Sequence, residues 1–187
     1  DCVAAKARAD ISVIGTWRDA IRIDQAAVAD YVAGGLNIQR DVIGNCPSKC
    51  MEWDGSKLKI DNSNCRRCMH CINVMPKGLR PGTDTGATVL IGSKAPIVEG
   101  ALLSSVLLPF VKIDGDEFDD FCEIMEEIQD VWCEEGKARE RIGEFIQRVG
   151  MGNFLEAVGL EPVPEMAAFP RDNPYVFYGQ EDEEEEG

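Results

Sequence analysis

Three cysteines in an unbroken C-x-x-C-x-x-C run constrain the fold of this chain more than any other feature. They are Cys65, Cys68 and Cys71, and a fourth cysteine, Cys46, lies upstream directly before Pro47. Cysteine thiolates in such a pattern are typical ligands of an iron–sulfur cluster, which stores and passes single electrons. The run therefore predicts a small module whose core is largely a metal cluster.

The cysteine spacing predicts one cluster in this module. In bacterial two-cluster ferredoxins the run is C-x2-C-x2-C-x3-C-P, and its last cysteine binds the other cluster. Here Met75 stands before Pro76, and the positions that would complete a second set also lack cysteine: Leu36, Gln39 and Val42. We therefore expect a single [4Fe-4S] cluster with four ligands, which are Cys46, Cys65, Cys68 and Cys71.

Other uses of these cysteines fit the spacing less well. A structural zinc site prefers two separated C-x-x-C pairs or Cys/His pairs. A Rieske site needs two histidines, and His70 is the only one, so we expect it at the surface or just outside the ligands. Eight cysteines could form disulfides in an oxidising compartment, but a chain of 187 residues is too large to need them. Two alternative functions stay open: a non-catalytic [4Fe-4S] electron-transfer subunit of another redox complex, and a zinc-stabilised interaction domain.

The remaining cysteines have different expected roles. Cys50 follows Cys46 by four residues, so it should lie near the cluster, but it is surplus to a filled set of ligands. We expect Cys50 to pack there or to lie just outside the ligands. Cys122 and Cys133 fall on a predicted helix and are expected to be buried packing thiols. Taken alone, Cys2 would be an ordinary small apolar residue.

The charge and hydropathy exclude two classes of function. The formal net charge is −15, whereas nucleic-acid binding needs a basic surface. Six of the negative charges lie at residues 181–186, an acidic tail that we expect to be solvated. The longest apolar stretch, residues 96–111, contains Glu99 and two serines, so it is too short and too polar to span a membrane. With no targeting segment expected, we predict a cytoplasmic protein.

Strands and helices are expected to alternate on both sides of the cysteines. With Asp54 and Gly55 as a hairpin turn, strands are predicted at residues 11–14, 51–53, 58–60 and 87–91. Helices are predicted at residues 3–9, 25–32, 98–108, 117–135, 137–149 and 151–158. Asp24 and Asp116 are the expected N-caps, and three glycines are expected to end helices: Gly34, Gly136 and Gly150. The apolar face of the long helix comprises Phe118, Phe121, Cys122, Met125, Ile128 and Trp132.

These elements predict an α+β protein in which a bacterial ferredoxin-like module is inserted into a larger α/β domain. The composition is 44% hydrophobic, enough for one substantial core and a small module. We expect the larger domain at residues 1–34 and 84–160, the module at 35–83, and a Pro-rich arm with the acidic tail at 161–187. Because residue 1 is Asp, we also expect the sequence to be a fragment of a longer chain.

Six specific motifs are spread along the chain, at residues 1–4 (DCVA), 15–19 (GTWRD), 46–50 (CPSKC), 65–73 (CRRCMHCIN), 143–148 (GEFIQR) and 173–177 (NPYVF). Together they resemble the C-terminal part of the alpha subunits of dissimilatory sulfite reductase. The beta subunits have a similar layout, but Met75 before Pro76 and residues 171–175 resemble the alpha form. The resemblance covers essentially the whole chain and implies a partial sirohaem sulfite/nitrite reductase-type domain with an inserted ferredoxin-like domain.

The resemblance also implies an activity, cofactors and partners. Members of the family reduce sulfite by six electrons, to sulfide or a carrier-bound sulfur species, at a sirohaem whose iron is bridged by a cysteine to a second [4Fe-4S] cluster. By resemblance, Cys2 is that bridging thiolate, and the other three ligands and the sulfite-binding residues lie upstream of this chain. The implied partners are the beta subunit, a second alpha–beta pair in an α2β2 assembly, and a small gamma sulfur carrier. The fragment alone is therefore expected to lack a complete catalytic site.

Overall fold

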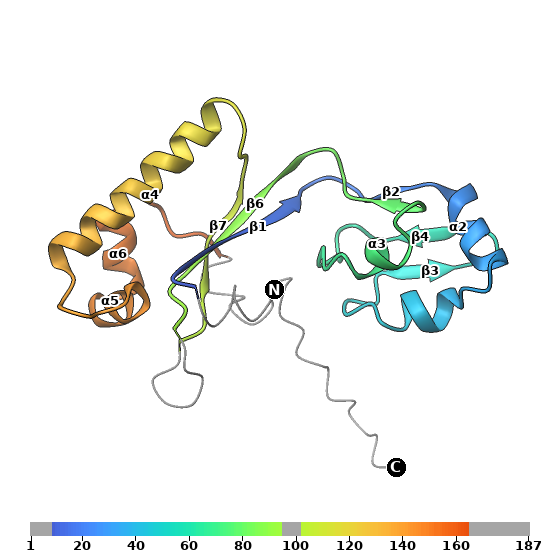
Figure 1. Cartoon of the computed structure of the whole chain (residues 1–187), viewed down its shortest axis with the longest axis horizontal. Helices are drawn as coiled ribbons and strands as arrows, with labels where there is room; N and C mark the ends of the chain where they lie inside the picture. The colour runs from blue at the N-terminus through green and yellow to red at the C-terminus, as the bar shows by residue number, and fades with distance from the viewer. Residues whose placement is uncertain (1–8, 95–101, 165–187) are drawn as a thin grey trace, which may run out of the picture. The chain divides into compact units, whose positions relative to one another are not determined.

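A computed structural model of the protein describes residues 9–94 and 102–164 (Figure 1). Within these ranges the chain forms two compact units. Residues 17–84 make up the first unit, called the cysteine module. Residues 9–16, 85–94 and 102–164 belong to the second, called the sheet–helix unit. No helix in the described ranges is both long and apolar enough to cross a membrane.

The sheet–helix unit contains a sheet with the strand order β1-β6-β7. Its strands are β1 (Ile11–Trp17), β6 (Thr85–Ile91) and β7 (Ser105–Val111). The predicted strand at residues 87–91 is confirmed as the buried part of the central strand β6. The predicted strand at residues 11–14 is longer than expected, because β1 continues through Gly15 to Trp17.

The prediction of a helix at residues 98–108 is wrong, because residues 105–111 form the strand β7. A short apolar run is compatible with either a buried helix or a buried strand. Antiparallel pairing with β6, in which Ile91 lies opposite Ser105, selects the strand here. Pro109 has no N–H to donate, but β7 is at the edge of the described sheet, where proline is tolerated. Residues 98–101 of the predicted helix lie outside the described ranges, as does the helix predicted at 3–9 apart from its last residue.

Three helices follow the sheet: α4 (Asp116–Glu135), α5 (Ile142–Val149) and α6 (Met151–Ala157) (Figure 1). Helix α4 ends at Gly136 as predicted, but its N-cap is Gly115, and Asp116 is already the first helical residue. The predicted helix start at residue 137 is wrong, because α5 begins five residues later. Its start is fixed by Glu144, whose Oε2 accepts a hydrogen bond from the N–H of Arg141 at 3.0 Å.

Apolar side chains from the sheet and all three helices form one core in this unit. Phe145 of α5 and Phe154 of α6 are each 1% exposed and pack edge to face, with their ring centroids 6.2 Å apart. Ile128 of α4 is buried with them. Phe118 in the first turn of α4 lies beside Phe121 of the predicted apolar face, with their ring centroids 6.2 Å apart, but it is 42% exposed.

The cysteine module is made of short elements around a second core. Its two strand pairs are antiparallel: β2 (Arg22–Ile23) with β5 (Leu79–Arg80), and β3 (Met51–Trp53) with β4 (Leu58–Ile60). The second pair confirms the predicted hairpin around Asp54 and Gly55. The helical segments are α2 (Gln25–Ala33), the π-helical turn η1 (Gln39–Ile43) and α3 (His70–Val74).

Helix α2 follows its predicted signals and packs within the module. The Oδ1 of Asp24 accepts hydrogen bonds from the N–H groups of Ala26 and Ala27, both at 3.1 Å, and Gly34 ends the helix. The side chain of Val28 is fully buried in the module core. The packing thus includes α2 in the module, whereas the predicted module begins at residue 35 and leaves α2 out. The four predicted domain ranges themselves stay predictions.

Candidate functional site

Five cysteines of the module line one pocket: Cys46, Cys50, Cys65, Cys68 and Cys71. Its other walls include apolar side chains from β3 and β4, among them Met51 and Ile60. The pocket is a partly open hollow between these side chains. The four cysteines predicted from the sequence as ligands are therefore all brought to the same pocket, together with a fifth.

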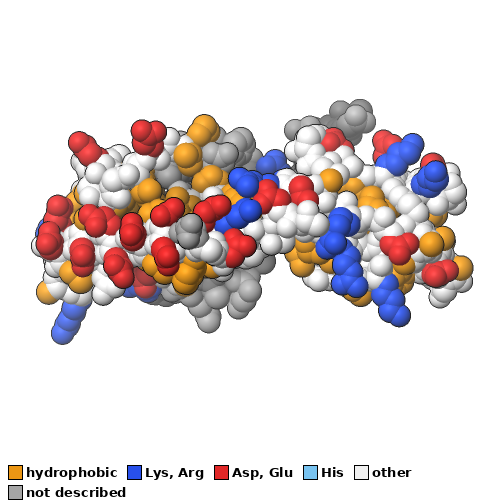
Figure 2. Space-filling model, turned by 90° about the horizontal axis from the view of Figure 1, so that it is seen from above, with side chains coloured by type: hydrophobic (Ala, Val, Ile, Leu, Met, Phe, Trp, Pro, Cys, Tyr) orange, Lys and Arg blue, Asp and Glu red, His pale blue; other side chains and the backbone are white. Residues whose placement is uncertain are grey.

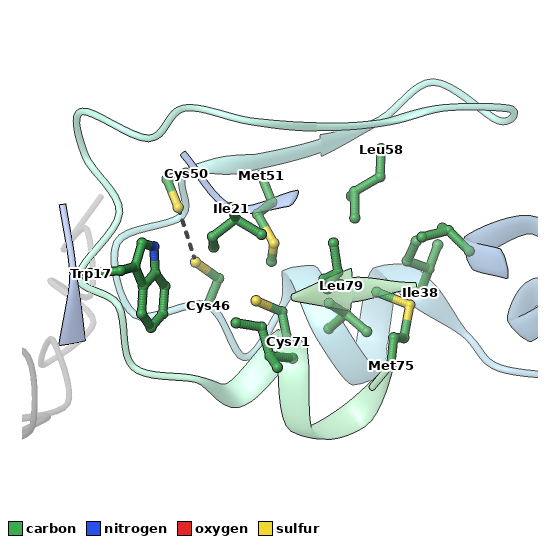
Figure 3. Close-up of a cluster of buried hydrophobic side chains, with 13 residues drawn as sticks. Trp17, Ile21, Ile38, Cys46, Cys50, Met51, Leu58, Cys71, Met75 and Leu79 are labelled. Atoms are coloured by element: carbon green, nitrogen blue, oxygen red, sulfur yellow. Dashed lines mark hydrogen bonds between the residues drawn. The ribbon is translucent and has the colours of Figure 1, made fainter. Parts of the chain in front are cut away.

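A tight turn brings the first two cysteines side by side. The N–H of Lys49 donates a hydrogen bond to the carbonyl of Cys46 at 3.2 Å, and Lys49 adopts a left-handed conformation with φ of 47°. The chain then reverses into β3, and the Sγ atoms of Cys46 and Cys50 come within 3.7 Å of each other (Figure 3). Both side chains are buried.

A hydrogen-bonded loop leads into the cysteine run. The carboxylate of Asp61 accepts hydrogen bonds from the N–H of Ser63 at 3.0 Å and the Nδ2 of Asn64 at 2.7 Å. The hydroxyl of Ser63 donates a further hydrogen bond to this carboxylate. Together these bonds, with that of the hydroxyl the most important, lower the pKa of Asp61 below its usual value. Asn62 accepts a hydrogen bond from the N–H of Ile21 at 2.9 Å and so fastens the loop to the preceding segment. Hydrogen bonds within the protein therefore hold the loop that leads to Cys65.

The cysteine run itself contains two residues in the left-handed region. Arg67 has φ of 53° and Met69 has φ of 66°, a conformation that costs a non-glycine residue about 1–2 kcal/mol. Together with Lys49, they are three of the four described non-glycine residues with positive φ, and all three are in the loops of the pocket. Strain of this kind clusters at functional sites, where the surrounding structure maintains it. Here the left-handed residues turn the backbone around the pocket. The N–H of Arg67 donates a hydrogen bond to the Sγ of Cys65 at 3.4 Å.

Burial keeps several of these thiols protonated when no cation is near. It raises the pKa of Cys71 to about 12, with the neighbouring Cys68 and Cys65 adding to the effect. Burial is also the main reason why the pKa of Cys50 is raised to about 12 and that of Cys68 is raised. Thiolates form in such a pocket when a bound metal neutralises their charge, because metal binding displaces the thiol protons.

The donor set suits a group larger than one metal ion. Among the described residues, no three Cys, His, Asp or Glu side chains converge closely enough to hold a single ion. The cysteines instead surround a space from several sides, and an all-sulfur donor set is the one that iron–sulfur clusters use. The residues present therefore fit a [4Fe-4S] cluster better than a zinc ion.

The side chain of His70 contacts a backbone carbonyl group. Its Nε2 lies 3.0 Å from the carbonyl oxygen of Asp41, at hydrogen-bonding distance, and its side chain is half-buried at the pocket. This contact ties α3 to the π-helical turn η1.

The other sequence-predicted cysteines are elsewhere. Cys122 is half-buried on α4, whereas Cys133 on the last turn of α4 is exposed, so the prediction of a buried thiol is wrong for Cys133. Cys2 lies outside the described residues. Sequence reasoning missed the direct contact between Cys50 and Cys46, although their separation of four residues was a signal that the two thiols could meet across a turn.

Comparison with known proteins gives a consistent match. The family model described as "Nitrite and sulphite reductase 4Fe-4S domain" matches residues 1–165. The dissimilatory-type sulfite reductase subunit alpha of Nitratidesulfovibrio vulgaris (strain Hildenborough) is 48% identical over 196 residues, which cover 97% of this chain and 45% of that protein. The subunit of the same name from Megalodesulfovibrio gigas is 43% identical, over 89% of this chain and 91% of that sequence.

A solved structure agrees with the sequence matches. A crystal structure of dissimilatory sulfite reductase I superposes with a TM-score of 0.81 at 45% identity, and the match covers 96% of this chain and 45% of that chain. The chain thus spans about half the length of the N. vulgaris relative and of the solved chain.

Proposed function

Because the chain belongs to the nitrite and sulphite reductase 4Fe-4S domain family, and within it to the alpha subunits of dissimilatory-type sulfite reductase, we propose that it supplies the electron-relay cluster of such a subunit. Its fold is the α+β class of that family, with a ferredoxin-like module inserted. The observation that carries the proposal is the module pocket, into which the cysteine run and the upstream cysteine both bring their sulfurs.

Four thiolates are assigned to the cluster: Cys46, Cys65, Cys68 and Cys71. A bound [4Fe-4S] cluster supplies one-electron storage and transfer. Apolar side chains in the wall of the pocket, among them Met51 and Ile60, shield the sulfurs partly from water. The hydrogen bond from the N–H of Arg67 to the Sγ of Cys65 stabilises negative charge on that sulfur, which favours the reduced state.

The activity of the whole protein is proposed from its relatives. We assign to it the six-electron reduction of sulfite to sulfide or to a carrier-bound sulfur species, at a sirohaem, in the cytoplasm. Cys2 is assigned as the thiolate that bridges the sirohaem iron to a second [4Fe-4S] cluster; this rests on the resemblance of residues 1–4 alone. We also propose three partners: a beta subunit, a second alpha–beta pair and a small gamma sulfur carrier. The designation "subunit alpha" in the names of the relatives supports the presence of partner subunits.

Reconstitution of the chain with iron and sulfide under anaerobic conditions tests the cluster assignment. About four iron atoms and four sulfides per chain are expected, and Cys68→Ser is expected to lose most of them. Cys122→Ser is the matched control, since it removes a half-buried cysteine of α4 and should keep the full cluster. Zinc bound without sulfide would support the zinc-stabilised interaction domain instead. Iron near eight per chain would show two clusters.

The assignment of Cys2 needs the complete subunit. Replacing Cys2 by Ala there is expected to abolish the magnetic coupling between haem iron and the second cluster and to leave the spectrum of the module cluster unchanged. Coupling that persists in the variant would show that another residue forms the bridge.

A further inference from the structure

The module pocket contains one more thiol than its proposed cluster needs. Cys50 lines the pocket together with the four assigned ligands. It is about as deeply buried as Cys46, because Cys50 is 9% exposed and Cys46 is 8% exposed. Most surplus cysteines in a core are simply packing residues. Cys50 differs from them in its position, because its sulfur directly contacts that of an assigned ligand.

The backbone holds these two sulfurs together from both sides. On the side of Cys46, its own N–H donates to the carbonyl of Ile43 at 3.0 Å, and its carbonyl accepts from Lys49 at 3.2 Å. On the side of Cys50, the carbonyl accepts a hydrogen bond from the N–H of Asp61 at 2.8 Å, which ties it to the end of the β3–β4 hairpin. Backbone hydrogen bonds therefore hold the chain on both sides of the two sulfurs, which lie 3.7 Å apart (Figure 3).

We propose that Cys50 is an alternative ligand for the iron that Cys46 holds. This inference rests on the proposed [4Fe-4S] cluster and assigns a role to a residue that the four-ligand scheme leaves without one. In the exchange, the bond between iron and the Sγ of Cys46 breaks and a bond between the same iron and the Sγ of Cys50 forms. The proton of the Cys50 thiol passes to the Cys46 thiolate, so charge is conserved and no oxidant or reductant is needed.

The substitution is restricted to one corner of the cluster. Among the described cysteines, no other pair of sulfurs lies within hydrogen-bonding distance. Cys68 and Cys71 therefore have no hydrogen-bonded thiol beside them that could take their place as Cys50 does for Cys46. Since a [4Fe-4S] cluster needs four thiolates, loss of either should empty the pocket, whereas loss of Cys46 should not.

Anaerobic reconstitution of the full 187-residue chain tests this with four variants: Cys46→Ala, Cys50→Ala, the double variant and Cys71→Ala. Iron and sulfide per chain and the electron paramagnetic resonance spectrum of the reduced cluster are measured. Cys50→Ala should keep about four iron atoms per chain, because Cys46 remains as the ligand, and its spectrum should be that of the Cys46-ligated cluster alone. Cys46→Ala should keep about four iron atoms per chain with a shifted spectrum, because one iron now has a different thiolate. The double variant and Cys71→Ala should fall to a small fraction of that iron content.

The outcomes separate this inference from the proposed function. If the wild type binds the cluster but Cys46→Ala and Cys46→Ser both lose it, Cys50 is not an alternative ligand, whether the cluster is lost directly or because the module unfolds. Equal loss of iron in Cys46→Ala and in the double variant would likewise overturn the role of Cys50. A wild type that binds no iron and sulfide would instead overturn the proposed function itself, and this inference with it.

Discussion

The two units of this protein have cores of different kinds. In the sheet–helix unit, large apolar side chains from three strands and three helices fill the interior, and Phe145 and Phe154 are each 1% exposed. In the cysteine module, the elements are two to nine residues long, and three of the buried core residues are cysteines that face a pocket: Cys46, Cys50 and Cys71. One unit therefore has a core complete in itself, whereas the other is built around space for a ligand.

The charges of the two units differ as well. Residues 17–84 contain ten Lys and Arg and eight Asp and Glu, so the module is close to neutral. Helix α4 alone contains ten acidic and no basic residues, and Figure 2 shows acidic side chains along it. The strongly negative net charge of the chain is thus a property of the sheet–helix unit and the tail. A nearly neutral module is the better environment for four thiolates, because nearby negative charge would oppose them.

Because the two units have different kinds of core, removal of the cluster should have the largest effect, and it should act on the folding of the module alone. A chelator under anaerobic, reducing conditions should unfold the module, because metal binding and folding are linked where the metal occupies the core. Hydrogen exchange followed by mass spectrometry should then show near-complete loss of protection in β3, β4 and α3, while α5 and α6 stay protected. Equal loss of protection in both units would show that their stabilities are not separate.

A cavity in the other core should give the converse result. Phe145→Ala removes a fully buried ring and should destabilise the sheet–helix unit by about 3–5 kcal/mol. Denaturant unfolding followed by far-UV circular dichroism measures this, and cluster absorbance reports on the module in the same samples. Phe118→Ala is the matched control, because Phe118 is 42% exposed and should cost far less. A bleached cluster in Phe145→Ala under native conditions would contradict the comparison.

The sequence predicted the features that depend on local signals. Asp24 before an Ala-rich segment located α2, the Asp54–Gly55 turn located the β3–β4 hairpin, and the cysteine run indicated an iron–sulfur module. The motifs also identified the family, which the relatives confirm. Each of these signals lies within a few residues of the structure that it determines.

Features that depend on distant partners could not be predicted in this way. Strand β7 forms because residues 105–111 pair with β6, and the apolar run alone does not distinguish that from a helix. The contact between Cys46 and Cys50 is local, but it depends on the left-handed conformation of Lys49, which propensity disfavours for lysine. The end of β1 at Trp17 belongs here too, since the Trp17 side chain is buried in the module core.

A smaller effect on module stability is expected from adding a methyl group at Gly78, where two segments of the module lie close together. A Cβ atom added at Gly78 would lie 2.8 Å from the Cγ2 of Val28, a fully buried side chain of α2. Gly78→Ala should therefore lower module stability by about 1–3 kcal/mol through overpacking, seen as a lower denaturant midpoint for cluster absorbance. Gly152→Ala on α6 is the control, since no atom lies within 4 Å of its added Cβ. A drop in midpoint as large in the control would refute this explanation.

The smallest effect concerns an ion pair within the sheet–helix unit, between Glu140 and Arg148. Glu140 accepts hydrogen bonds from Arg148 at 2.7 and 2.8 Å, and this pairing above all lowers the pKa of Glu140 to about 2. The usual pKa of a glutamate in an unfolded chain is about 4.3. Since the folded state has the lower pKa, the pairing stabilises the unit fully above that value, and the stabilisation is lost as the pH falls towards 2.

Hydrogen exchange of α5, corrected for the pH dependence of the intrinsic rate, should therefore show protection that declines over this acidic window. Glu140→Gln should reduce the decline, because the variant has no carboxylate to protonate at that position. Glu156→Gln, at an exposed position of α6, is the control and should follow the wild type. If Glu140→Gln and Glu156→Gln give the same pH profile as the wild type, the ion pair between Glu140 and Arg148 does not contribute to the acid stability of this unit.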